Sequence, residues 1–338
     1  MLKVGYTPCT QDTSHGARIG QVLEEAMAEA QLAEKCGFDS CFFTEHHQQA
    51  DYYIPNPLML ALAAGQKTQK LKVGTCVLLL PLQHPVHVAE DSAIIDQMTG
   101  GRLILGLGVG YSEADFGAFG IPVNERAART VEGIEIIKKS WGEGAFSYQG
   151  KHYRLDQVSV TPKPRQKPHP PIWLGAGTLA GLKRAARLAD GWVADLMQGV
   201  AVIKGFAQMY RDEAKKCGKT PFVVLMRDVW VADSMEAARR SSDPLMYTHR
   251  FYFRNKGYVE DEVLKEVHSE QDWTFDLAAK NRIIVGSPQD CREQLQMWQE
   301  EVRPDYVVLR MRHPGGPTHS KTLEAIRIFG EKILPAIS

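Results

Sequence analysis

The chain has 338 residues, of which 44% are hydrophobic and 24% are charged, and its formal net charge is zero. This balance is typical of a globular protein and gives no reason to expect binding to nucleic acid or to an anionic membrane. The start of the chain lacks the pattern of a signal peptide, and no apolar run approaches the roughly 18 residues of a membrane span. The six cysteines are scattered without a CxxC pair, so we expect reduced core cysteines in a cytoplasmic protein.

Predicted strands and helices alternate along the first 141 residues. Short apolar runs predict strands at 2–6, 39–44, 71–80 and 102–110. Helical periodicity predicts helices at 21–38, 56–69, 84–101 and 124–141. Asn56 and Pro57 have the residue types expected at the start of the second helix.

The alternation pauses at residues 144–171, which predict a hairpin followed by a proline-rich strap. Further strands are predicted at 171–177, 191–196, 221–232 and 305–311, and further helices at 178–189, 200–218, 287–301 and 323–334. A polar, aromatic segment from about residue 233 to 282 follows neither pattern.

Eight predicted strands, each followed by a helix, imply a parallel sheet that is buried on both faces. Eight such units close into a (β/α)8 TIM barrel, for which about 250 residues plus insertions is a typical length. An open, doubly wound sheet is the alternative. We therefore predict a single domain over residues 1–338, with an insertion at about 233–282.

The stretch FFTEHH ends the second predicted strand, and strand ends carry the chemistry in a barrel of this kind. Neighbouring strand residues point to opposite faces, so His46 and His47 are not expected to share a metal ion, and we predict no metal site. The alternative to a functional histidine is a core residue that only forms hydrogen bonds. The strand ends collect imidazoles, glycines and cations but few carboxylates, which argues against glycoside hydrolysis.

The stretch GLGVGY after the fourth strand resembles part of a dinucleotide fingerprint but lacks its last glycine and its helix. We interpret Gly108 and Tyr111 as contacts for a large planar ligand, with tight packing of the barrel as the alternative.

The stretch GAGTLAGL leads from the fifth strand into a helix whose predicted cap is Thr178. Free backbone amides and the helix dipole at such a start favour a phosphate, and ordinary capping is the alternative. Arg310 and Arg312, which alternation allows to face the same way, are the competing cations.

Together these residues resemble the luciferase-like flavin-dependent monooxygenase superfamily over nearly the whole chain, less clearly between about 233 and 282. The matching stretches are AEKCGFDSCFFTEHH, LKVGTCVLLLPLQHPVHVAED, IIDQMTGGRLILGLGVGY and PIWLGAG. The resemblance implies a barrel, often dimeric, that binds FMN or a deazaflavin at the carboxyl ends of its strands.

The resemblance also implies particular site residues. The first histidine of EHH is catalytic in bacterial luciferases, which here is His46. The family's bulge in the third strand, often with a non-proline cis peptide, falls near Cys76 and Val77. The phosphate loop corresponds to Gly175, Gly177, Thr178 and Leu179. Two departures argue against aldehyde bioluminescence, because Val109 replaces an arginine and Ala176-Gly177 replaces a Glu-Ser pair.

We therefore expect a monooxygenase that oxidises a small organic substrate with reduced FMN, supplied by a separate flavin reductase because no second nucleotide domain is evident. The alternatives are a deazaflavin-dependent oxidoreductase that transfers hydride, a flavin-binding protein without catalysis, and a metal-dependent hydrolase. Aromatic residues such as Phe251 and Phe253 lead us to expect that the 233–282 segment shapes the substrate pocket, as a lid over an apolar substrate. An oligomer contact and a plain amphipathic helix are the alternatives.

Overall fold

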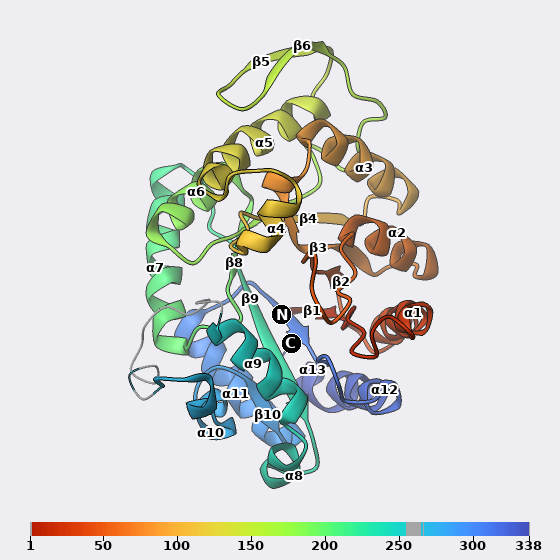
Figure 1. Cartoon of the computed structure of the whole chain (residues 1–338), viewed down its shortest axis with the longest axis vertical. Coiled ribbons are helices and arrows are strands. Elements are labelled where there is room, and N and C mark those ends of the chain that lie inside the picture. The colour runs from red at the N-terminus through yellow and green to blue at the C-terminus, as the bar shows by residue number, and fades with distance from the viewer. Residues whose placement is uncertain (1, 255–264, 266, 338) are drawn as a thin grey trace.

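The computed structural model describes residues 2–254, 265 and 267–337, and within them eight parallel strands close into a barrel (Figure 1). The strands are β1 (Lys3–Thr7), β2 (Ser40–Phe43), β3 (Lys72–Leu79), β4 (Leu103–Gly108), β7 (Ile172–Gly175), β8 (Gly191–Ala194), β9 (Val223–Val231) and β11 (Tyr306–Arg310). They pair in this order, and β11 pairs back to β1. The TIM barrel is confirmed, and the open sheet is excluded.

A ring of helices covers the outside of the barrel (Figure 1). Its members are α1 (Ile19–Lys35), α2 (Pro57–Lys67), α3 (Pro85–Met98), α5 (Arg126–Trp141), α6 (Leu179–Leu188), α7 (Val200–Lys216), α11 (Pro288–Val302) and α12 (His319–Ile328). Asn56 caps α2 by accepting from the N–H of Met59, and Ser287 caps α11 by accepting from Asp290, as their residue types predict. No helix in the described ranges is long and apolar enough to cross a membrane.

Shorter elements complete the described chain. The predicted hairpin is present as β5 (Phe146–Gln149) and β6 (Arg154–Val158). The stretch after β4 contains a short helix, α4 (Glu113–Ala118), that the sequence did not indicate. Single turns and the last helix are η1 (Leu80–Leu82), η2 (Val123–Glu125), η5 (Phe329–Ile333) and α13 (Leu334–Ile337).

The segment from about 233 to 282 leaves the barrel after β9 and forms a small cluster of its own. It contains α8 (Met235–Arg240), α9 (Asp243–Arg254), η4 (Glu270–Asp272) and α10 (Phe275–Ala279). A strand that the sequence missed, β10 (Ile284–Gly286), then pairs in parallel with the end of β9. Three residues are too few to show alternation, so β10 carries no periodic signal. The side chains of Phe251 and Phe253 lie outside the described part of the chain.

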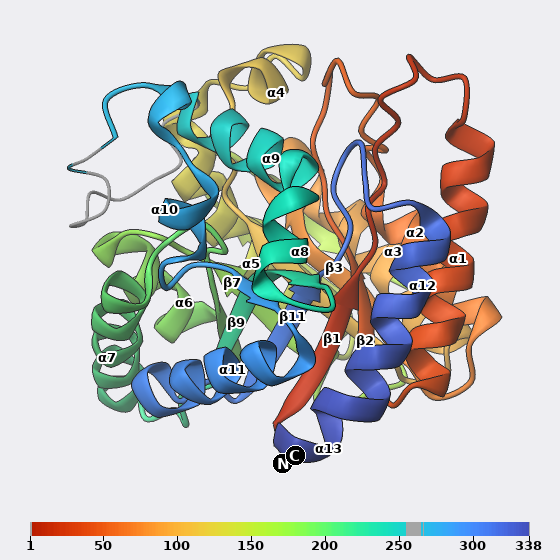
Figure 2. The same ribbon diagram turned by 90° about the horizontal axis from the view of Figure 1, so that it is seen from below.

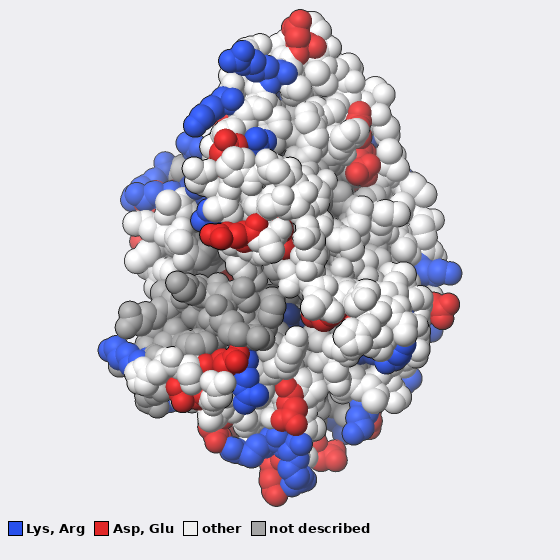
Figure 3. All heavy atoms as spheres, in the orientation of Figure 1, with Lys and Arg blue, Asp and Glu red and all other residues white. Residues whose placement is uncertain are grey.

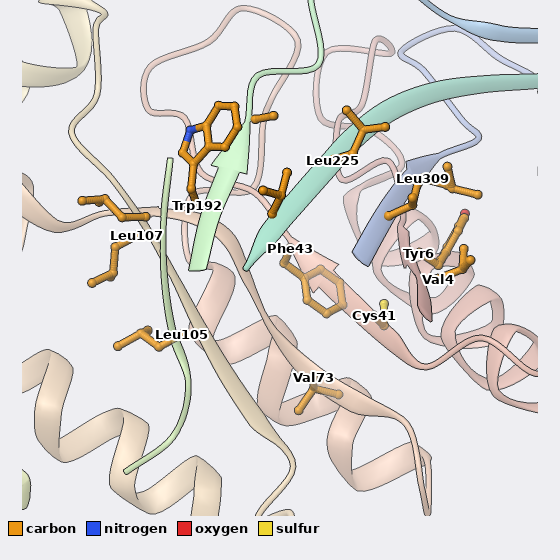
Figure 4. Close-up of a cluster of buried hydrophobic side chains, with 14 of the residues drawn as sticks. Val4, Tyr6, Cys41, Phe43, Val73, Leu105, Leu107, Trp192, Leu225 and Leu309 are labelled. Atoms are coloured by element: carbon orange, nitrogen blue, oxygen red, sulfur yellow. The ribbon is translucent and has the colours of Figure 1, made fainter. Parts of the chain in front are cut away.

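The barrel strands are buried on both sides, which is why they are continuous apolar runs rather than alternating ones. All six residues of β4 are buried. Outward-facing side chains such as Phe43, Leu105 and Trp192 pack beneath the helices (Figure 4). A second cluster that includes Phe42, Trp173, Tyr306 and their neighbours joins β2, β7 and β11.

The two ends of the barrel differ in what covers them. α4 and α9 lie over one end, and the chain termini lie at the opposite end (Figure 2). The covered end is the carboxyl end of the strands, so it is where a site is expected. All six cysteines are unpaired, but Cys217 is exposed at the end of α7 and is not the core residue that we expected.

Candidate active site

His46 lies just beyond β2 at the covered end of the barrel, and its ring is held on several sides. Its Nδ1 is 3.1 Å from Oδ2 of Asp115, a residue of α4 whose side chain is 1% exposed. The rings of Tyr53 and Tyr111 meet the imidazole edge-on, with centroids 5.2 and 5.8 Å away. Because Nδ1 faces Asp115 and the ring lines a pocket, Nε2 is the nitrogen that can meet a ligand.

Asp115 ties α4 to the loop after β2. Its Oδ1 accepts the backbone N–H of His47 at 3.2 Å, while Oδ2 faces His46. Ser112 caps α4 by accepting the backbone N–H of Asp115. Burial raises the pKa of the Asp115 carboxyl, but the hydrogen bond to His46 and the neighbouring histidine charges outweigh burial, so this pKa lies below its usual value. An ionised carboxylate at Nδ1 favours the tautomer that carries its proton there.

His47 has a different environment from its neighbour. Its Nε2 is 2.7 Å from Oε1 of buried Glu45, and its ring packs edge-on against Phe119. The other oxygen of Glu45 accepts the backbone N–H of Leu79 at the end of β3, at 2.7 Å. Within FFTEHH, therefore, the first histidine lines the pocket and the second joins β2 to β3 and to the segment after β4.

A pocket that is open to solvent lies beside His46. Its described lining comes from the loops after β1 and β2, from α9 and from the end of β11. The lining residues are Gln11, His46, Gln49, Asp51, Tyr53, Tyr247, Thr248, Arg310 and Pro314. Tyr247 and Thr248 belong to the 233–282 segment, so this segment contributes to the wall of the pocket.

Except for Tyr111, the predicted cofactor contacts lie at the ends of β3, β4 and β7 and at the start of α6, which do not contribute to the described lining of the pocket. β3 has the bulge that the resemblance implies, since its pairing with β4 shifts between Thr75 and Leu78, and the Cys76–Val77 peptide is cis. The Cys76 side chain is buried among barrel residues, and burial raises the pKa of its thiol to about 12. Only the backbone of Cys76 can therefore meet a ligand, whereas Val77 is half-buried.

Val77 lies between the ends of β4 and β7. A Cβ built at Gly108 would be 2.5 Å from Cγ2 of Val77, and one built at Gly175 would be 3.7 Å from its Cγ1. Close packing therefore accounts for Gly108, and a ligand contact there stays a prediction. Tyr111 is exposed beyond the strand, with its ring against His46 instead of against the strand end.

The start of α6 has the geometry that the phosphate prediction needs. Thr178 is the N-cap, and its Oγ1 accepts the N–H of Gly181 at 3.2 Å. The N–H groups of Leu179 and Ala180 in the first turn have no acceptor within the helix, as at any helix start. A Cβ built at Gly177 would meet no heavy atom within 4 Å, so this side of the loop is open.

Arg310, at the end of β11, is engaged by a buried carboxylate. It donates from Nε to Oδ1 of Asp228 at 2.6 Å and from Nη2 to Oδ2 at 3.0 Å. His249 of α9 is 3.3 Å from the same carboxylate. Burial raises the pKa of Asp228, but Arg310 and the surrounding donors hold it well below its usual range. This cluster fastens α9 to the barrel beside the pocket.

The side chain of Arg312 contacts α1 and is not part of the described lining of the pocket. It donates to Glu25 and Glu29 of α1 at 2.5 and 2.9 Å. β11 ends at Arg310, so strand alternation does not extend to Arg312. The expectation that both arginines face the same way is therefore wrong.

The strand ends alone did not reveal the carboxylates near the site. Asp115 comes from a short helix, Asp51 from a loop, and Asp228 precedes the end of its strand. None of these three carboxylates is among the last residues of a strand, where site residues were expected. The prediction that the mouth contains few carboxylates is therefore wrong. Within the described ranges, no group of three or more His, Cys, Asp or Glu residues could hold a metal ion.

In TIM-barrel proteins the functional site is built from the carboxyl ends of the strands and the loops that follow them. His46 and the pocket beside it lie in this position. The family described as luciferase-like monooxygenase matches residues 4–302, and the chain belongs to this family.

Three similar proteins illustrate the range of the family. The chain is 23% identical over 292 residues to the oxygenase component of a flavin-dependent trigonelline monooxygenase from Acinetobacter baylyi, covering 82% of this chain and 81% of that protein. It is 26% identical over 319 residues to an F420-dependent glucose-6-phosphate dehydrogenase from Nakamurella multipartita, covering 91% of each. The crystal structure of the monooxygenase RslO1 from Streptomyces bottropensis superposes with a TM-score of 0.86 at 24% identity, covering all of both chains, and supports the fold.

Proposed function

We propose that the protein is a flavin-dependent monooxygenase that oxidises a small organic substrate with reduced FMN and dioxygen. The observation that carries this proposal is the His46 ring, fixed at Nδ1 by Asp115 and lining an open pocket on a barrel of this family. Reduced FMN, when bound, would supply the electrons that activate dioxygen. The protein would supply binding, orientation and exclusion of water.

The residues opposite the pocket fit an FMN molecule. The amides of Leu179 and Ala180 and the positive end of the α6 dipole would hold the phosphate, and the open space at Gly177 admits it. Val77 offers an apolar edge between Gly108 and Gly175 against which a planar ring system could lie. Side chains of β3, β4 and β7 would then fix the ring without charged groups.

His46 would hold or move a proton at Nε2. Its neighbour Asp115 would stabilise the protonated ring and keep Nε2 directed into the pocket, since Nδ1 is occupied. Tyr53 and Tyr111 restrict rotation of the ring from its two edges. This is the role of a general acid or base close to the reacting groups.

A deazaflavin-dependent hydride transfer on the same site is the second candidate. The similarity to an F420-dependent dehydrogenase supports it, because F420 is a deazaflavin that also carries a phosphate. The amides at α6 could accept the phosphate group of either cofactor, so the phosphate loop does not decide between them.

We further propose a separate flavin reductase as partner, in the cytoplasm. The similarity to a protein that is named an oxygenase component supports a two-component system. Unpaired cysteines throughout the chain are typical of a reducing compartment.

We also propose that the protein forms a homodimer through α2 and α3. Met59 of α2 and Ile94 and Met98 of α3 are exposed, and Gln66 of α2 donates to the backbone oxygen of Met98, which places the helices side by side. Figure 3 shows only a few charged side chains over these helices on the face that it draws. Light scattering on the purified protein should therefore give twice the mass of one chain, and Met59→Glu should shift it toward the monomer.

Anaerobic titration with reduced FMN and with reduced F420 tests the proposed function. Reduced FMN should bind more tightly, and admission of dioxygen should then reoxidise it in a reaction whose rate changes in His46→Ala. Tighter binding of F420, with no reaction with dioxygen, would support the second candidate instead.

A further inference from the structure

The pocket beside His46 presents both polar and apolar surface. Among its described lining residues Pro314 is the only aliphatic one, and the others offer amide, hydroxyl, carboxylate, imidazole or guanidinium groups together with the rings of Tyr53 and Tyr247. A ligand that covers the polar groups without replacing the hydrogen bonds that they make with water would lose about 1–3 kcal/mol for each unmade bond. The pocket therefore suits a ligand that combines a polar group with an apolar part.

The two charged side chains of the lining, Arg310 and Asp51, differ in their partners. The charge of Arg310 is already balanced, because Asp228 accepts two hydrogen bonds from it at 2.6 and 3.0 Å. An anionic ligand at Arg310 would have to compete with this buried carboxylate, so an anion is disfavoured there.

Asp51 forms no ion pair with an arginine or lysine in the described part of the chain, and the nearby charge that acts on it is that of His46. Its Oδ2 accepts a hydrogen bond from the neutral amide of Gln11 at 2.6 Å, and the backbone N–H groups of Asp51 and Tyr53 also stabilise the ionised carboxylate. Its Oδ1 is buried and has no hydrogen-bond partner among the described residues. The backbone oxygen of Asp51 accepts the N–H of Asp12 at 2.8 Å, which helps to fix the loop that presents the carboxylate. Burial raises the pKa of Asp51, since a carboxylate that has lost water is less stable when ionised.

Aromatic rings complete this environment. Tyr53 and Tyr247 both line the pocket, from the loop after β2 and from α9. The face of an aromatic ring attracts a cation, with a typical strength of about 0.5–2 kcal/mol. A buried carboxylate oxygen that no described residue hydrogen-bonds, in a pocket lined by two tyrosines, is a site for a positively charged hydrogen-bond donor.

We propose that the substrate of this enzyme carries a cationic nitrogen, such as an ammonium group, which donates a hydrogen bond to Oδ1 of Asp51 beside Tyr53 and Tyr247. This assignment of the substrate class rests on the proposed function in one respect: the bound molecule is taken to be the compound that reacts next to His46. The aliphatic aldehydes and other uncharged chains that a nonpolar pocket would take are disfavoured.

Three ligands of matched size test the assignment by calorimetric titration at pH 7: benzylammonium, benzyl alcohol and benzoate. They share a ring and differ in charge. Benzylammonium should bind about 10-fold more tightly than benzyl alcohol, which is the effect expected of a hydrogen bond between charged groups, and benzoate should bind most weakly. In Asp51→Asn the preference for benzylammonium over the alcohol should disappear.

The control is Asp156→Asn, which removes the same charge from β6 of the exposed hairpin and should keep the preference. Equal binding of the ammonium and the alcohol by the native protein would overturn the assignment, whether or not Asp51→Asn folds. Tightest binding of benzoate would overturn it too, and would make Arg310 the recognition group.

FMN titration of the same samples separates this inference from the proposed function. A protein that binds FMN but has no ammonium preference retains the function and loses the substrate class. If the protein prefers benzylammonium but does not bind FMN, the pocket is still a cation site. The proposed flavin-dependent function is then wrong, and the bound cation is not the substrate of a flavin enzyme.

Discussion

The two sides of the barrel mouth differ in the chemical groups that they present. On the side of β2, α4 and β11, polar side chains dominate: His46, Asp115, Asp51 and Arg310 are held by hydrogen bonds between segments that are far apart in the sequence. On the side of β3, β4 and β7, small residues and backbone dominate, and Val77 and the start of α6 offer an apolar edge and free amides.

From this difference we infer that one side of the mouth binds the cofactor and the other binds the substrate. Backbone amides and an apolar edge bind any ligand with a phosphate and a flat ring, so they suit a cofactor that relatives share. Side chains from loops and from α9 can change without disturbing the barrel, so they suit a substrate particular to this protein. Substitutions on the side of β2, α4 and β11 should therefore affect turnover and substrate affinity. Substitutions on the side of β3, β4 and β7 should affect cofactor affinity.

The largest expected effect is that of His46→Ala. Loss of a general acid or base typically lowers turnover about 100- to 10,000-fold, and FMN affinity should stay within about twofold because the phosphate site is on the other side. Steady-state turnover and FMN titration measure the two quantities. The matched control is His47→Ala, which should lose less activity because His47 does not line the pocket. Native turnover in His46→Ala would remove the catalytic assignment.

Asp115→Asn should reduce turnover by about 10-fold, since a positioning carboxylate acts through the histidine that it orients. NMR spectra of ¹⁵N-labelled histidine should show His46 protonated at Nδ1 in the native protein and a mixture of tautomers in the variant. A merely structural role for Asp115 would lower stability and leave the tautomer unchanged. In that case His46 and Asp115 do not act together in catalysis.

Asp115 also predicts a pH dependence of stability. Its folded-state pKa lies below the unfolded value of about 3.9, so its contribution is fully present above that value and is lost as the pH falls through the folded pKa. Native protein should be more stable than Asp115→Asn at pH 7 in urea denaturation, and the difference should shrink below about pH 4. A difference that is independent of pH would mean that packing, not charge, is responsible.

Gly177→Asp should act on the opposite side and through the phosphate. A carboxylate about 4 Å from a phosphate costs roughly 1 kcal/mol under water-like screening and several times more in a drier site. FMN binding should therefore weaken by at least about fivefold more than riboflavin binding, which isothermal titration of both ligands would show. Equal weakening of the two ligands would place the anion site elsewhere.

The smallest overall effect is expected from Tyr247→Ala in α9. Because this tyrosine lines the pocket and not the phosphate loop, the variant should alter the relative affinities for benzylammonium and benzyl alcohol and leave FMN affinity within about twofold. The earlier expectation for Phe251 and Phe253 is of the same kind, and double replacement by alanine tests it. A large loss of FMN affinity in either variant would contradict the division between the two sides.

The sequence predicted the barrel because each strand is an apolar run and each helix has a periodic face. It also predicted the caps at Asn56 and Thr178, whose residue types match the local geometry. It missed β10, which is only three residues long, and α4, whose glycine-containing stretch shows little periodicity.

The site was predicted less completely than the fold. His46, the bulge and the cis peptide at Cys76–Val77 follow from a resemblance in short local stretches. The partner of His46 does not, because Asp115 is 69 positions away and meets it only through folding. Asp51 carries no signal of its own either. Its proposed role depends on a side-chain oxygen that finds no hydrogen-bond partner among the residues the structure describes, which only the folded chain reveals.

A crystal structure of the protein with bound FMN tests the central claim most directly, because one map locates both ends of the cofactor. The account predicts the phosphate within hydrogen-bonding distance of the amides of Leu179 and Ala180, the ring system beside Val77, and its edge facing Nε2 of His46. A phosphate bound by Arg310, or a ring that fills the pocket next to Asp51, would contradict the assignment of cofactor and substrate to opposite sides of the mouth.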